Sequence, residues 1–103
     1  MNDIAIYGFG GYGREIASII KSINTVKPTW NILGFFDDDQ SKLGLENEYG
    51  KVLGGIDFVN SYDKELSVVM AIASPNVLEK IITNINNPNL SFPNIIAPTV
   101  FFF

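Results

Sequence analysis

Cysteine and histidine are both absent from the 103 residues of the sequence. Without cysteine, the chain can form no disulfide, no thiolate zinc site and no cysteine nucleophile. Without histidine, it lacks the side chain whose unperturbed pKa suits a base near neutral pH. These absences exclude several classes of enzyme mechanism and agree with an ordinary cytoplasmic location.

Positive charge and long apolar runs are also scarce. The chain has 7 Lys and Arg residues against 11 Asp and Glu residues, a net charge of −4 that argues against nucleic acid as a partner. It has no run of about 18 apolar residues for a membrane span, and its N-terminus does not have the pattern of a signal peptide. Its 47% of hydrophobic residues and its length are typical of one soluble globular domain. We expect no membrane partner.

Short apolar runs alternate with helical patterns along the chain. We predict strands over residues 4–7, 30–36, 67–73 and 92–97. We predict helices over residues 12–23, 56–62 and 75–86. Residues 40–54 are expected to be mostly loop, with at most a short strand over 51–53. This alternation predicts an α/β, Rossmann-like three-layer domain with a mostly parallel sheet.

The last predicted helix has a clear start signal. Ser74 is expected as its N-cap and Pro75 as its first residue, where the missing N–H of proline costs nothing. The apolar face is expected to consist of Val77, Leu78, Ile81, Ile82 and Ile85. A turn-rich segment at residues 86–89 should end the helix.

Four glycines fall within the seven residues YGFGGYG, between the first predicted strand and the first predicted helix. In the pattern Gly8-x-Gly10-x-x-Gly13, the first glycine makes the tight turn, the second leaves room for a pyrophosphate and the third lets helix and strand pack closely. The free N–H groups at the start of the helix would face the anion. We predict a phosphate site formed by these three glycines with Gly11 and Tyr12, and the alternative is a purely structural turn.

Three consecutive aspartates, at positions 37–39, follow the second predicted strand. Asp37 lies 24 positions beyond Gly13, close to the distance at which dinucleotide-binding units place an acid for the ribose hydroxyls. Asp37 and Asp38 are therefore candidates to accept hydrogen bonds from a ribose or from a base N–H. The alternative is a solvated turn. Magnesium binding is less favoured, because the sequence offers no second acidic cluster with suitable spacing.

Ligands of parallel α/β sheets bind outside the carboxyl ends of the strands, where the strand order reverses. We therefore expect the glycine turn and the aspartates to meet the segment that follows the third strand, with Ala73, Ser74 and Asn76 as its binding residues. Arg14, in the first turn of the first helix, could neutralise a phosphate, although an arginine in that place is more often solvated.

Five segments, in order along the chain, resemble one family: IAIYGFGGYGREIASII, ILGFFDDD, KVLGGIDFV, VVMAIASPNVLEKI and FPNIIAP. The family is the N-terminal domain of the PglD/NeuD-like sugar acyltransferases, which include sialic acid O-acetyltransferases. The resemblance implies that this domain binds a nucleotide sugar, commonly a UDP-amino-sugar. It also implies that acetyl-CoA is bound elsewhere, by a C-terminal left-handed β-helix that assembles the trimer.

The sequence also departs from the family pattern. The family often has histidine at the positions of Tyr12 and Ala97, and an arginine at the position of Leu78. No hexapeptide repeats of the β-helix follow Pro98. We therefore expect residues 1–98 to form a nucleotide-sugar-binding domain with no catalytic residue and no cofactor of its own, and whether the chain acts as an enzyme stays open.

Two other functions stay open at this point: a small dinucleotide-binding (NAD-type) or nucleotide-sensing domain, and an interaction domain whose glycine turn no longer binds anything. The apolar tail over residues 99–103 is where the family's β-helix would begin. We expect self-association through this tail, because so small a sheet cannot easily cover its side chains. The alternative is a disordered end.

Overall fold

The computed structural model describes residues 1–95 of the chain. Within them, a six-stranded sheet has the order β3-β4-β2-β1-β5-β6. The strands are β1 (Asn2–Tyr7), β2 (Trp30–Phe36), β3 (Glu46–Asn47), β4 (Gly50–Gly54), β5 (Leu66–Met70) and β6 (Leu90–Ser91). The helices are α1 (Gly11–Val26), α2 (Ile56–Ser61) and α3 (Pro75–Asn84), with one 3₁₀ turn, η1 (Gln40–Lys42).

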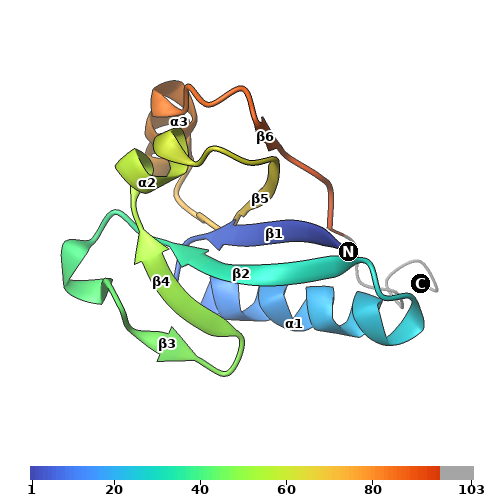
Figure 1. Ribbon diagram of the computed structural model, residues 1–103. Helices are drawn as coiled ribbons and strands as arrows, with labels where there is room; N and C mark the ends of the chain where they lie inside the picture. Colours follow the sequence, from blue (N-terminus) through green and yellow to red (C-terminus); the bar gives the residue numbers. More distant parts are fainter. Residues whose placement is uncertain (96–103) are drawn as a thin grey trace.

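The sheet is mostly parallel and lies between two helical layers. All its strand pairs are parallel except β3 with β4, which is antiparallel. Helix α1 covers one face, and α2 and α3 cover the other (Figure 1). The chain order along the sheet reverses at β1, which has β2 on one side and β5 on the other. This arrangement confirms the predicted α/β, Rossmann-like three-layer fold.

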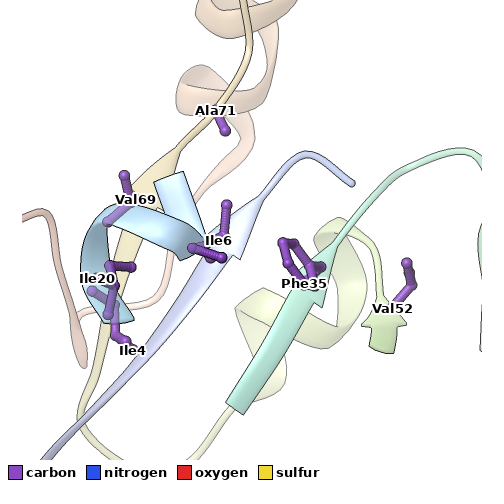
Figure 2. Packing of buried hydrophobic residues seen from close by; sticks show 8 residues of the cluster. Ile4, Ile6, Ile20, Phe35, Val52, Val69 and Ala71 are labelled. Atoms are coloured by element: carbon purple, nitrogen blue, oxygen red, sulfur yellow. The ribbon is translucent and has the colours of Figure 1, made fainter. Parts of the chain in front are cut away.

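Strand β1 supplies side chains to both cores because its residues alternate between the two faces of the sheet. Ile4 and Ile6 pack on the α1 side, with Ala17, Ile20, Phe35, Val52, Val69 and Ala71 (Figure 2). Ala5 and Tyr7 pack on the other side, with Phe36, Val59, Leu66, Val68 and Ile81. Burying each large aliphatic side chain contributes about 1.5–3 kcal/mol to stability. Because β1 has buried side chains on both faces of the sheet, it is the centre of both cores.

Several predicted elements are confirmed. Strand β2 has the predicted bounds, and α2 ends one residue earlier than expected. Helix α3 begins at Pro75, with Ser74 as its N-cap, as the sequence indicated. The Ser74 side chain accepts a hydrogen bond from the backbone N–H of Val77 at 3.5 Å.

The prediction of a mostly irregular segment over residues 40–54 was wrong in part. This segment contains η1 and a hairpin of β3 and β4, and β4 pairs in parallel with β2. Val52 of β4 is 2% exposed, and it packs in the core on the α1 side. The segment has many glycines and charges, so its sequence shows little of the alternation that marks a strand, and tertiary pairing decides its structure.

The predicted last strand over residues 92–97 was also wrong in position. The structure has β6 at Leu90–Ser91, and residues 92–95 are not in a strand. Leu90 pairs with Leu66, and Ser91 pairs with Ser67, through the parallel ladder with β5. Residues 96 and 97 lie outside the described part of the chain, as does the apolar tail over 99–103.

The second half of the domain shows smaller differences. Strand β5 ends at Met70 rather than at residue 73, and α3 ends at Asn84 rather than at residue 86. Of the predicted apolar face of α3, Ile81 is buried, whereas Val77 and Ile82 are about half exposed, at 47% and 52%. The helix therefore touches the sheet along a narrower stripe than its sequence suggested. None of the helices in residues 1–95 has both the length and the apolar character needed to cross a membrane.

Candidate functional site

Two of the glycines in the turn after β1 are required by packing. Gly8 has φ +120°, and a Cβ there would lie 2.5 Å from the carbonyl oxygen of Ala71. A Cβ at Gly13 would overlap the carbonyl oxygen of Gly8. These contacts let β1, the end of β5 and the start of α1 approach one another closely, which is the structural part of the predicted pattern.

The other two glycines face open space. A Cβ at Gly10 or at Gly11 would have no heavy atom of the described chain within 4 Å. Gly10 is the N-cap of α1, and within residues 1–95 no side chain accepts a hydrogen bond from the first turn of this helix. Tyr12, next in the chain, is 46% exposed. The backbone N–H groups at the positive end of α1 are therefore accessible to an anion.

Asp37 links the acidic turn, residues 37–39, to the glycine turn through a hydrogen bond. Its Oδ2 accepts a hydrogen bond from the backbone N–H of Phe9 at 3.1 Å and lies 3.6 Å from the Nζ of Lys42. Its Oδ1 accepts from the backbone N–H of Asp39 at 2.9 Å. Both carboxylate oxygens therefore have partners within the protein, and the side chain is 17% exposed.

Asp38 makes its hydrogen bonds through a single oxygen. Its Oδ1 accepts from the hydroxyl of Tyr7 at 2.7 Å and from the backbone N–H of Ile56 at 3.0 Å. Its Oδ2 has no hydrogen-bond partner among the described residues, so it can still accept. Burial raises the pKa of the Tyr7 phenol far above its usual value, and the Asp38 carboxylate raises it further, so this hydroxyl remains a donor.

A groove of about 860 Å³ lies beside the acidic turn, between the ends of β2 and β4 and helix α3. Its acidic residues are Asp37, Asp38 and Asp57, and Lys80 of α3 is its one basic residue among the described residues. Its apolar residues include Leu43, Val77 and Ile81. The volume is in the range of small-molecule sites, and the lining combines apolar surface with hydrogen-bond acceptors.

The segment after the third predicted strand, with Ala73, Ser74 and Asn76, lies near the glycine turn and the groove but makes no direct contact with the aspartates among the described hydrogen bonds. The end of β5 touches the glycine turn, because the N–H of Ala71 donates to the carbonyl of Tyr7 at 2.8 Å. Ala73 and Asn76 are exposed, and Ser74 is occupied in capping α3. The structure therefore brings the glycine turn and the aspartates into direct contact, while Ala73, Ser74 and Asn76 lie at the start of the helix that borders the groove.

Arg14 forms an exposed ion pair with Glu48. Its guanidinium donates two hydrogen bonds to the carboxylate of Glu48, in the loop between β3 and β4. These bonds lower the pKa of Glu48 to about 2 and raise the pKa of Arg14. Both side chains are more than half exposed, at 60% and 51%. Arg14 thus connects α1 to the hairpin rather than standing alone in solvent.

Residues 3–85 match the protein family described as the PglD N-terminal domain. The match covers well over half of the 103 residues. The chain belongs to this family. It is the family of N-terminal domains of PglD-like sugar acyltransferases that the motifs within residues 3–85 resemble.

The fold of this PglD N-terminal domain also occurs in a solved structure. The crystal structure of UDP-D-quinovosamine 4-dehydrogenase from Vibrio fischeri is similar, with a TM-score of 0.57 and 13% sequence identity. The similarity covers 91% of this chain and 80% of that chain. At such low identity it shows a shared fold alone. No curated protein matches the chain significantly.

Sequence reasoning missed several residues of this PglD N-terminal domain that line the groove. Gly54 ends β4, Gly55 and Asp57 follow it, and Lys80 lies on α3. The pair Gly54 and Gly55, directly after an apolar stretch, was a sequence signal for this part of the groove. Such pairs occur at strand ends where another group approaches the backbone closely. Among residues 1–95, no group of three or more His, Cys, Asp or Glu side chains is arranged to hold a metal ion.

Proposed function

We propose that this domain binds a nucleotide sugar of the UDP-amino-sugar class. The phosphates lie at the start of α1, and the nucleoside lies in the groove beside Asp38. Membership of the PglD N-terminal domain family supports the proposal. The name of the structurally similar dehydrogenase, which refers to a UDP-sugar, agrees with it.

The observation that carries this proposal is the contrast between the two pairs of glycines. Gly8 and Gly13 are needed for packing, whereas Gly10 and Gly11 have open space where a Cβ would be. If the turn had only a structural role, packing would not require glycine at positions 10 and 11. Bare backbone at a helix N-terminus suits a phosphate, which needs close approach to N–H groups.

The charge of the groove suits the neutral part of such a ligand. Asp38 and Asp57 are acceptors for the hydroxyl and N–H donors of a nucleoside, and they would repel a phosphate. The phosphate would therefore bind at the positive end of α1 rather than in the groove. The apolar side chains of Leu43 and Val77 offer surface for a base.

The test is a thermal-shift series with UDP-N-acetylglucosamine, UDP, NAD and inorganic pyrophosphate at millimolar concentration. A ligand that binds only the native state raises the Tm. We expect both uridine ligands to raise it more than NAD does. A larger shift with NAD would instead favour a dinucleotide-binding domain, and no shift with any ligand would favour an interaction domain.

Gly10→Val should abolish the shifts, because the side chain would occupy the space in front of the first-turn N–H groups. Ser18→Val, on an exposed position of the same helix, is the matched control and should keep them. A folded Gly10→Val variant with unchanged UDP affinity would rule out the phosphate site.

A further inference from the structure

Tyr7 carries a hydroxyl that packing alone does not explain. The residue is 1% exposed at the carboxyl end of β1, and its ring packs edge-on against Phe36 at a centroid distance of 5.8 Å. A phenylalanine would fill the same space. A buried hydroxyl is costly without a partner, and here the partner is the Oδ1 atom of Asp38 at 2.7 Å.

We propose that Tyr7 is a positioning residue of the nucleotide-sugar site: its hydroxyl holds Asp38 so that the second carboxylate oxygen stays available to the nucleoside. This proposal rests on the proposed function and assigns the ligand contact within it. Tyr7 itself touches the core and Asp38, and it acts on the ligand through that carboxylate.

The hydrogen bonds of Asp38 fix one oxygen from two directions. The Tyr7 hydroxyl comes from β1, and the backbone N–H of Ile56 comes from the start of α2. Two donors on Oδ1 restrict the rotation of the carboxyl group, and Oδ2 has no partner among the described residues. A carboxylate fixed in this way loses little conformational entropy when a ribose hydroxyl or base N–H binds.

The neighbouring aspartate is arranged differently. Both oxygens of Asp37 accept backbone N–H groups, from Phe9 and Asp39, and Oδ2 also lies near Lys42. Asp37 stands at the spacing at which related folds place their ribose-binding acid, yet its hydrogen bonds build the turn. We therefore assign the ligand contact to Asp38. The hydrogen bond from the Tyr7 hydroxyl is what distinguishes Asp38 from Asp37.

The test measures the affinity of the intact chain for UDP and for inorganic pyrophosphate by calorimetry. Tyr7→Phe removes the hydroxyl alone, and Tyr62→Phe is the matched control, because the Tyr62 hydroxyl has no hydrogen-bond partner among residues 1–95. Loss of one such hydrogen bond predicts about 3–10-fold weaker UDP binding by Tyr7→Phe. Pyrophosphate binding and the Tyr62→Phe variant should be unchanged.

A double-mutant cycle separates this role from a general loss of structure. Asp38→Asn should weaken UDP binding, and adding Tyr7→Phe should weaken it little further, because both changes affect the same contact. Asp38→Glu provides a second route if Tyr7→Phe does not fold. It keeps the charge but moves the carboxylate by one methylene, and it should also weaken UDP binding selectively.

Three results would overturn the proposal. The first is wild-type affinity of folded Tyr7→Phe for UDP, and the second is full retention of UDP binding by Asp38→Glu. The third is an equal loss of UDP and pyrophosphate binding in Tyr7→Phe, which would indicate a general structural effect. Failure of the unmodified chain to bind either compound would instead overturn the proposed function, and the role of Tyr7 with it.

Discussion

The backbone N–H of Phe9 donates a hydrogen bond to the Oδ2 atom of Asp37 at 3.1 Å, which joins the glycine turn to the acidic turn. Two segments that are 28 residues apart in the sequence thus share one hydrogen bond at the carboxyl ends of neighbouring strands. The geometry of the turn after β1 depends on the side chain that follows β2.

Asp37→Asn should lower the stability of the fold. The amide group can replace only one of the two acceptor oxygens, so one backbone N–H, of Phe9 or Asp39, would lose its partner. Hydrogen bonds to charged groups contribute about 1.5–3 kcal/mol, and we expect a loss within that range. Urea unfolding measures it. Asp63→Asn is the control and should be neutral, because Asp63 is exposed and its side chain accepts no hydrogen bond from the described residues.

Alanine substitutions at Gly13 and Gly11 should have opposite effects. A Cβ at Gly13 would overlap the carbonyl oxygen of Gly8, so Gly13→Ala should lower the free energy of unfolding by about 3 kcal/mol. A Cβ at Gly11 meets no other described residue within 4 Å, so Gly11→Ala should raise it by about 0.5–1 kcal/mol. Denaturant titrations of the two variants test this. Equal effects would contradict the packing described for the turn.

Two adjacent isoleucines of α3 should differ sharply in their contribution to stability. Ile81 is 6% exposed, so Ile81→Ala should cost about 2–5 kcal/mol. Ile82 is 52% exposed, so Ile82→Ala should change stability by less than about 0.5 kcal/mol. The midpoints of chemical denaturation give the comparison, and a large loss in Ile82→Ala would contradict the orientation of α3.

The ion pair of Arg14 with Glu48 should contribute to stability in a pH-dependent way. Hydrogen bonds from Arg14 lower the pKa of Glu48 from 4.5 to about 2. A lowered pKa means that the contribution is complete above pH 4.5 and disappears as the pH falls towards 2. Glu48→Gln should therefore reduce the fall in Tm between pH 5 and pH 2.

The effect of Glu48→Gln should be small, and it should shrink further in 1 M salt, because both side chains are exposed. Glu79→Gln, on the exposed side of α3, serves as a control for the loss of one negative charge. Identical pH profiles for the unmodified chain and Glu48→Gln would contradict a contribution from the ion pair.

The elements that could be predicted from the sequence are those whose signals are local. The glycine pattern marked the turn before α1, and Ser74 with Pro75 marked the start of α3. Strand β2 was found because it is a largely apolar segment that ends at the aspartates. Strand β4 was underestimated because only Val52 is deeply buried, and the pairing with β2 that makes it a strand is not local.

The same distinction holds for the candidate site. The positions of Asp37 and Asp38 after a strand predicted that they lie at its carboxyl end, near the glycine turn, and the structure has them there. The sequence could not show which of them keeps a carboxylate oxygen available, because this depends on Tyr7 and Ile56, which belong to other elements. Val77 and Ile81 of α3 also line the groove, but their spacing fits a purely apolar face, and Lys80 carries no local signal of a site.

Both outer strands of the sheet within residues 1–95, β3 and β6, have only two residues each. An unpaired strand edge is a template on which another chain can add a strand, and very short edge strands are one of the ways in which proteins resist such growth. Strands β3 and β6 can each offer another chain a ladder of two residues at most. The short lengths of β3 and β6 therefore disfavour amyloid-like growth by strand addition to these two strands.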